Sequence, residues 1–170
     1  CDGKFKPFER DPETFVRKWA LPGTPGLEHR VGGLEKTPAG AVSSDPQVHE
    51  KMVAARAAKI AKVADLIPEL EVFGEQSGDI LIVGWGGTYG HLYTATKNLV
   101  EEGMKVGLAH FDYINPLPKN TAEVFSRFKK IIVCELNSGH FVNYLRAKEP
   151  DFKYEQLNKV QGQPFMVQEI

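Results

Sequence analysis

A run of four consecutive apolar residues at 80–83 is the strongest feature of the hydrophobic pattern along this chain. The run has no polar alternation, which is typical of a strand buried on both faces of a parallel sheet. Glycines are concentrated at 84–90 immediately after it, and apolar residues then recur at helical spacing over 92–100. The pattern therefore predicts a strand, a glycine turn and a helix.

The rest of the C-terminal two thirds repeats this alternation. Further strands are predicted at 71–74, 105–111, 131–136 and 154–160, with helices between the last three. Asn120, followed three residues later by Glu123, resembles a capping box at the start of one of these helices. Strands that alternate with short helices imply a mostly parallel sheet with right-handed crossovers, and helices on both of its faces.

The N-terminal part has a different pattern. Residues 1–46 are rich in Gly and Pro and show little periodicity, which is typical of an interdomain arm. Asp45 before Pro46 favours a helix start, and apolar spacing predicts a connecting helix over 47–69. The expected organisation is an arm, this helix and a domain at 70–170.

Three ionisable residues stand together between the glycine turns of the arm: Glu28, His29 and Arg30. They are candidates for a contact with substrate or with a neighbouring subunit. The simpler interpretation is that the arm packs onto a neighbouring domain while these charges stay solvated.

Composition narrows the classes of function. The formal net charge is −1 and 42% of the 170 residues are hydrophobic, so nothing indicates a nucleic-acid partner or an acidic membrane surface. No apolar stretch is long enough to span a membrane, and no leader pattern is recognised, so a cytoplasmic location is expected. Cys134 lies in an apolar run and is expected to be a buried, inert thiol. The histidines lack metal-ligand spacing, so no metal site is predicted.

In a parallel sheet, ligands and partners meet the loops at the carboxyl ends of the strands. Four residues in these loops are candidates for substrate-side or interface contacts: Trp85, Asn115, Glu135 and Asn137. Glu135 directly follows an apolar strand and is interpreted either as an acid with a perturbed pKa or as a satisfied cap or interface group. The spacing reveals neither a Ser-His-Asp triad nor paired catalytic carboxylates, so no catalytic residue is assigned.

The glycine turn allows two interpretations. A turn that opens onto a helix N-terminus can bind a phosphate, and Asp112 stands where a dinucleotide fold keeps its ribose-binding carboxylate. However, the pattern of Gly84, Gly86 and Gly90 is one residue longer than the common dinucleotide fingerprint. The other interpretation is that these glycines only let the helix pack closely on the sheet.

Several stretches together resemble the C-terminal part of the alpha subunit of 2-oxoacid:ferredoxin oxidoreductases, and most closely the 2-oxoglutarate type. The resemblance extends over nearly the whole chain. It is carried by six stretches in the same order, PGTPGLEHRVGGLE at 22–35, SSDPQVHEKMVAAR at 43–56, DILIVGWGGTYG at 79–90, YINPLP at 113–118, ELNSGH at 135–140 and VQGQPF at 160–165.

This resemblance implies a fold like the C-terminal domain of transketolase. That fold is a three-layer α/β/α arrangement around a five-stranded, mostly parallel sheet, with one antiparallel strand for which 71–74 is the candidate. It also implies that the chain is a fragment of a longer subunit, because the family's Tyr-Pro-Ile-Thr-Pro motif is missing. The expected partner is a beta subunit. In this family the beta subunit provides most of the contacts that bind thiamine diphosphate, with Mg, and an iron–sulfur cluster.

The family's reaction is the oxidative decarboxylation of a 2-oxoacid with coenzyme A, and it reduces ferredoxin. The resemblance implies that this piece is mainly structural, contacts other subunits and binds no cofactor by itself. Arg30 would suit the distal carboxylate of a dicarboxylic 2-oxoacid. The alternative is a free-standing nucleotide-binding module that uses the turn at 84–90.

Overall fold

The structure is a computed structural model that describes residues 5–170, and these divide into two units. The N-terminal unit ends at Leu66, and the C-terminal unit comprises Ile67–Ile170. Each unit has its own internal contacts and is described by itself.

The N-terminal unit is an irregular chain followed by helix α1, Pro46–Lys62, and a short 3-10 turn, Val63–Asp65. Asp45 caps the helix as predicted, because its Oδ1 accepts hydrogen bonds from the amides of Gln47 at 2.7 Å and Val48 at 3.3 Å. None of the residues of α1 is buried. The described part of this unit therefore has no hydrophobic core on this helix.

Lys36 is one of the two buried residues in the described part of the N-terminal unit, with Pro7. Its Nζ donates to the carbonyls of Gly32 at 2.9 Å and Leu34 at 2.7 Å, and it lies 5.3 Å from the ring centroid of Phe8. A buried ammonium must satisfy its donors. The chain around Lys36 is therefore held by these polar and cation–π contacts rather than by an apolar core.

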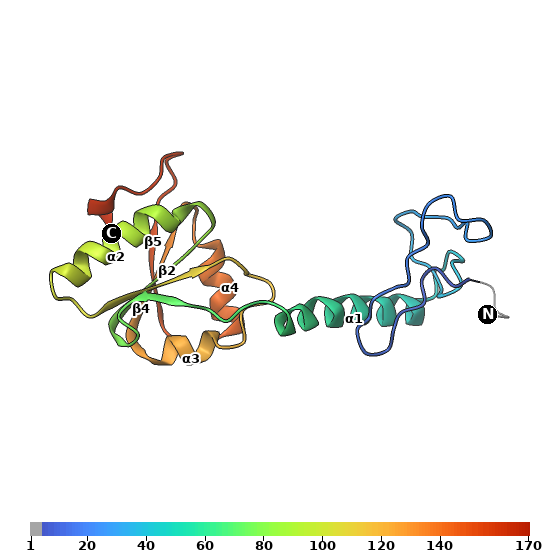
Figure 1. Ribbon diagram of the computed structural model, residues 1–170, viewed down its shortest axis with the longest axis horizontal. Coiled ribbons are helices and arrows are strands. Elements are labelled where there is room, and N and C mark those ends of the chain that lie inside the picture. The colour runs from blue at the N-terminus through green and yellow to red at the C-terminus, as the bar shows by residue number, and fades with distance from the viewer. Residues whose placement is uncertain (1–4) are drawn as a thin grey trace. The chain divides into compact units, whose positions relative to one another are not determined.

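The C-terminal unit is built on one five-stranded sheet with the order β1-β3-β2-β4-β5 (Figure 1). Its strands are β1 Val72–Gly74, β2 Gly78–Trp85, β3 Val106–Phe111, β4 Phe128–Glu135 and β5 Tyr154–Asn158. β1 pairs with β3 in antiparallel orientation, while the other neighbouring pairs are parallel. The predicted mixed sheet and its antiparallel strand are confirmed.

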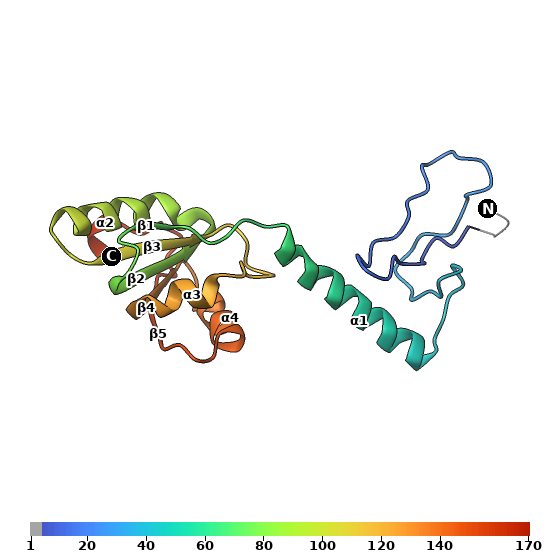
Figure 2. The same ribbon diagram turned by 60° about the horizontal axis from the view of Figure 1, so that its bottom comes forward.

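Helices cover both faces of this sheet. Helix α2, Tyr89–Glu101, lies on one face, and helices α3, Thr121–Ser126, and α4, His140–Lys148, lie on the other (Figures 1 and 2). The apolar residues accordingly form two clusters, one that includes Leu92 of α2 and one that includes residues of α3 and α4. Because both faces are covered, Leu81, Ile82 and Val83 of β2 are buried, as the continuous apolar pattern predicted. The three-layer arrangement is confirmed.

The capping box expected at Asn120 is not formed. Asn120 stands at the N-cap of α3, but its side chain makes no capping hydrogen bond. Instead, its Oδ1 accepts from the amide of Leu70 at 2.8 Å, and its Nδ2 donates to the Leu70 carbonyl at 3.0 Å. The Glu123 carboxylate pairs with Arg127 rather than reaching back to the cap. Asn120 therefore clamps the chain that enters β1, so this prediction was wrong.

Replacing Asn120 by alanine is expected to lower the free energy of unfolding by about 2 kcal/mol, because the part-buried amide and carbonyl of Leu70 lose their partner. Glu123→Ala is the matched control, since its exposed ion pair is worth about 0.5 kcal/mol or less. Urea unfolding of the two variants compares them. Equal losses would instead indicate a reciprocal capping box.

Candidate functional site

The order of the strands places one topological switch point in the C-terminal unit. From β2 the chain passes to β3 on one side and then to β4 on the other, so the connections diverge between β2 and β4. Ligands of open α/β sheets usually bind at the carboxyl ends of strands beside such a switch point. The residues at the carboxyl ends of β2 and β4 are therefore candidates for a functional site.

Trp85 and Glu135 lie side by side at this switch point. Val83 pairs with Val133, so the residues two positions further along each parallel strand lie side by side on the same face. Trp85 Nε1 donates to Glu135 Oε2 at 3.4 Å. The Trp85 ring also packs against that of Phe141, with 6.1 Å between centroids.

The Glu135 side chain is fully buried and its carboxylate is satisfied by the protein itself. It accepts hydrogen bonds from the amides of Phe141 at 2.8 Å and Val142 at 2.9 Å, in the first turn of α4. A helix N-terminus favours an anion there, and this carboxylate already fills that position. Of the two interpretations of Glu135, the geometry favours the cap.

The two candidate asparagines also contact α4 or the turn before it. Asn137 Oδ1 accepts from the amides of Gly139 and His140, each at 2.8 Å. Asn115 Oδ1 accepts from the Tyr144 hydroxyl at 3.1 Å. The structure thus brings Trp85, Glu135, Asn115 and Asn137 together around the first half of α4. Sequence reasoning missed Tyr144, although its spacing from Phe141 places both on one helix face.

Burial, together with the neighbouring Glu135 carboxylate, raises the pKa of the Cys134 thiol to about 12. Because the thiolate is the nucleophile, a Cys1→Ser variant at pH 8 should react with a thiol reagent only as it unfolds. Above the ordinary thiol pKa of about 9, only the unfolded state loses this proton, so stability should fall as pH rises from about 9 to about 12. Rates of reaction with the thiol reagent, measured with and without urea, check the expected protection of Cys134. Fast labelling of the native protein would contradict it.

The glycines of the turn at 84–90 differ in their surroundings. A Cβ added at Gly84 would lie 2.1 Å from Leu92 Cδ1 and 2.8 Å from Thr88 Oγ1, so this glycine lets α2 approach the sheet. Gly86 has a positive φ of 59°, and a Cβ on Gly86 or Gly90 would meet nothing within 4 Å. Close helix packing is therefore the observed role of Gly84.

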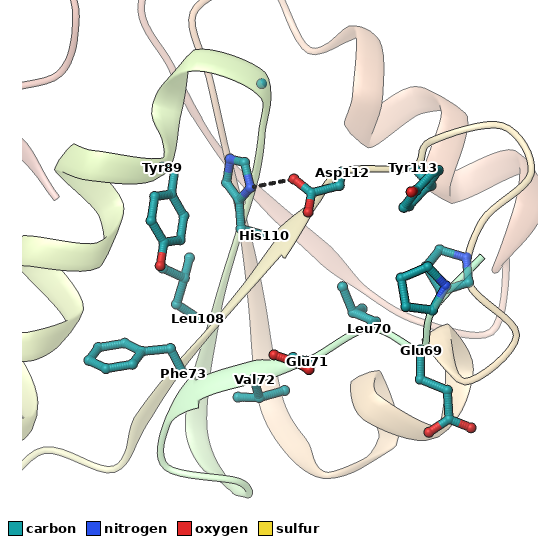
Figure 3. Close-up of a pocket in the computed structure, with 13 residues that line it drawn as sticks. Glu69, Leu70, Glu71, Val72, Phe73, Tyr89, Leu108, His110, Asp112 and Tyr113 are labelled. Atoms are coloured by element: carbon teal, nitrogen blue, oxygen red, sulfur yellow. Dashed lines mark ion pairs between the residues drawn. The ribbon is translucent and has the colours of Figure 1, made fainter.

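A hollow of about 730 Å³ lies at the β1 side of the sheet, beside the carboxyl ends of β2 and β3 (Figure 3). Its lining comes from the chain around β1, from the glycine turn and from the end of β3: Pro68, Glu69, Leu70, Glu71, Val72, Phe73, Gly86, Tyr89, Leu108, His110, Asp112, Tyr113 and Pro118. Sequence reasoning missed this hollow. The carboxylate of Asp112, a candidate ribose ligand in the sequence, is exposed and faces His110, with 3.8 Å between Oδ1 and Nδ1.

His110 is the most enclosed titratable group of the hollow, with 10% of its side chain exposed. Burial lowers its pKa, while the Asp112 carboxylate and the Gly86 backbone act in the opposite direction. Its Nε2 is buried and makes no well-formed hydrogen bond, although the Gly86 backbone is close enough to affect the pKa. Because burial is the largest of these effects, the imidazole is favoured in its neutral form.

The three ionisable candidates of the arm lie in the N-terminal unit and are exposed. His29 Nδ1 hydrogen-bonds the Leu27 carbonyl at 2.9 Å, and its ring packs against Phe5 with 5.6 Å between centroids. Glu28 and His29 line a hollow of about 480 Å³. Arg30 is exposed next to them.

Residues 78–170, more than half of the chain and nearly the whole C-terminal unit, match the family model of pyruvate:ferredoxin oxidoreductase core domain II. The chain belongs to this family. The matched residues contain strands β2 to β5 and helices α2 to α4, whereas β1 lies just before them. The expected resemblance to 2-oxoacid:ferredoxin oxidoreductases is confirmed.

Similarity to known proteins also covers the N-terminal unit of this chain. The chain is 42% identical over 98% of its length to 2-oxoglutarate oxidoreductase subunit KorA of Mycobacterium tuberculosis, and covers 25% of that protein. It is 28% identical over 99% of its length to the alpha subunit of 2-oxoacid:ferredoxin oxidoreductase 1 of Aeropyrum pernix, and covers 27% of it. The chain thus spans about a quarter of these relatives.

A solved structure resembles this chain over 98% of its length. This is 2-oxoglutarate:ferredoxin oxidoreductase from Magnetococcus marinus, with 2-oxoglutarate, coenzyme A and succinyl-CoA bound. The TM-score is 0.87 and the identity 32%, over 98% of this chain and 29% of the other. The core domain II and the arm before it therefore occur together in a larger enzyme chain.

Within residues 5–170, no group of three or more His, Cys, Asp or Glu side chains is arranged to hold a metal ion. In the same described range, no helix is long and apolar enough to cross a membrane. The core domain II thus offers no metal centre among its described residues.

Proposed function

We propose that this chain is the core domain II, with the preceding arm, of the alpha subunit of a 2-oxoglutarate:ferredoxin oxidoreductase. The observation that carries the proposal is the similarity to the Magnetococcus marinus enzyme over 98% of this chain, at 32% identity and a TM-score of 0.87. The 42% identity to a KorA subunit named for 2-oxoglutarate supports the same substrate. In the proposed reaction, 2-oxoglutarate, coenzyme A and two oxidised ferredoxins give succinyl-CoA, carbon dioxide, a proton and two reduced ferredoxins.

The proposed contribution of this piece is architecture and contacts with other subunits. The polar groups at its switch point already bind to one another and to α4, so they leave no free acid or base there. The hollow beside β1 contains three carboxylates and no Lys or Arg among its lining residues, which does not suit a diphosphate. Thiamine diphosphate, Mg and the iron–sulfur cluster are therefore assigned to other parts of the complex, including its beta subunit.

The proposed location of the assembly is the cytoplasm. Coenzyme A and ferredoxin are intracellular reactants, and Cys134 is a free thiol, as is usual for proteins of reducing compartments.

The test begins with native purification of the polypeptide that carries this sequence, using an antibody against it. We expect a parent chain several times longer, together with a smaller iron-containing subunit. The preparation should form succinyl-CoA and reduce ferredoxin only when both 2-oxoglutarate and coenzyme A are present. A lone chain of this size, or a complex that oxidises no 2-oxoacid, would contradict the proposal.

Arg30 is the proposed substrate-side residue of the arm, where a guanidinium can bind the distal carboxylate of 2-oxoglutarate. Arg30→Ala in the full complex should raise KM for 2-oxoglutarate about tenfold, with a smaller effect on kcat, because it removes a binding contact remote from the reacting carbonyl. Lys59→Ala, which removes an exposed cation from α1, is the control. An unchanged KM in Arg30→Ala would refute the role of this residue, but would leave the proposed reaction intact.

A further inference from the structure

Large apolar side chains of the arm lie at the surface of the N-terminal unit. Trp19 is 88% exposed, Leu21 is 74% exposed and Val31 is 79% exposed. Tryptophan is highly buried on average in folded proteins, so an almost fully exposed one is unusual. The arm has no apolar core of its own that could bury these side chains, because among its described residues only Pro7 and Lys36 are buried. Exposed apolar patches of this kind usually mark an interface.

The three apolar side chains line one hollow of about 480 Å³, between the chain at 17–24 and the chain at 27–31. Arg17 and Lys18 also line this hollow, together with a single carboxylate, that of Glu28. In the part of the chain that the structure describes, neither of these two cations forms an ion pair. Interfaces typically combine an apolar centre with a polar rim of complementary charge. The hollow therefore suits a partner surface that is apolar at its centre and has carboxylates at its edge.

The size of the relatives indicates where such a partner surface can come from. The chain covers 25% of the KorA subunit of Mycobacterium tuberculosis and 29% of the solved Magnetococcus marinus chain, so most of each polypeptide lies outside the match. Two parts of one polypeptide meet at a high effective concentration, about millimolar for short linkers, whereas a separate subunit must be captured from solution. A small apolar hollow is therefore sufficient for docking within one polypeptide.

We propose that this hollow of the arm is the docking site for another part of the same alpha-subunit polypeptide, outside the 170 residues of this chain, whose surface is apolar with carboxylates at its edge. Trp19 and Leu21 are the apolar anchors, because large exposed side chains at a hollow contribute most of the binding energy of an interface. Arg17 and Lys18 pair with the carboxylates at the edge. The inference rests on the proposed function, which supplies the longer polypeptide.

The first test places a photo-crosslinking p-benzoylphenylalanine at position 21 in the full, active complex. After irradiation we expect a crosslink within one alpha polypeptide, so the mass of this polypeptide on a denaturing gel stays unchanged. Mass spectrometry should assign the second peptide to a part of the subunit outside residues 1–170. A crosslink to another subunit or to a second alpha chain, crosslinks only within residues 1–170, or no crosslink would overturn the inference. Since formation of succinyl-CoA is measured on the same sample, this failure is distinct from a failure of the proposed function.

The second test removes the apolar anchors. The double variant Trp19→Ala, Leu21→Ala in the full complex should raise the rate of tryptic cleavage after Arg30 about tenfold, because the hollow is uncovered more often. Both side chains are mostly exposed in the arm itself, so the variant leaves the arm's own contacts in place. The control is Val160→Ala, which truncates a 69% exposed side chain of the C-terminal unit and should change the rate less than about twofold. Equal cleavage rates for the two variants would overturn the inference.

The third test concerns the charge of the partner surface. Lys18→Glu should raise the rate of cleavage after Arg30 about fivefold, because the reversed charge repels the carboxylates at the edge of the docked surface. Lys18→Gln, which only removes the cation, should raise the rate about twofold. If Lys18→Glu were cleaved no faster than Lys18→Gln, the acidic edge of the proposed partner surface would be refuted.

Discussion

Replacing Glu135 by alanine is expected to lower the free energy of unfolding by about 3–4 kcal/mol. The change leaves the amides of Phe141 and Val142 without acceptors in a buried place, and it removes the partner of Trp85 Nε1. It also removes a negative charge from the N-terminus of α4 and leaves a cavity at a fully buried position. Chemical unfolding followed by circular dichroism measures the loss.

Two further variants sharpen this prediction. Glu135→Gln keeps the volume and one acceptor oxygen, so its expected loss is smaller, about 1–2 kcal/mol. Glu155→Gln on β5, whose exposed carboxylate pairs with Lys130, should change stability by about 0.5 kcal/mol or less. If Glu135→Ala instead kept full stability and abolished turnover in the complex, Glu135 would be a catalytic acid rather than a cap.

Gly84→Ala is expected to destabilise the protein by about 2–3 kcal/mol. The added methyl group would lie 2.1 Å from Leu92 Cδ1, and Leu92 is fully buried between α2 and the sheet. Relief requires the buried Leu92 side chain to adopt another rotamer or α2 to shift, and either change disturbs the apolar cluster on that face. Thermal or urea unfolding measures the effect.

Gly90→Ala is the matched control from the same glycine cluster. Gly90 lies in the first turn of α2, and a Cβ there meets nothing within 4 Å. Alanine should therefore be neutral or stabilise the helix by up to about 1 kcal/mol. If both variants were stable but lost affinity for a nucleotide, the phosphate-binding interpretation of the turn would be restored.

The sequence predicted α1 and the elements of the C-terminal unit well because their signals are local. The apolar run at 80–83, the glycine turn after it and the cap at Asp45 each report on the backbone within a few residues. Their order in the chain also limits the topology, since strands joined by helices pair in parallel with right-handed crossovers. Boundaries were less accurate, and β4 begins at Phe128 rather than at 131.

Local sequence patterns gave a wrong prediction where a side chain has a partner far away in the chain. Asn120 and Glu123 have capping-box spacing, yet Asn120 binds Leu70, fifty residues earlier in the chain. The signal was ambiguous because the same amide group can cap a helix or clamp a strand. Only the position of the chain entering β1 decided between the two.

The sequence by itself determined the class of fold, the places of the strands and helices in the chain, and the set of polar residues at the strand ends. The tertiary structure alone decided which of these residues meet. The parallel register of β2 and β4 brings Trp85 to Glu135, fifty residues away, and turns a candidate acid into a cap for α4. The antiparallel pairing of β1 with β3 likewise brings Glu71 near Asp112 and His110 in one hollow. The physical reason is that periodicity specifies which face a side chain occupies, whereas strand register and packing specify its neighbours.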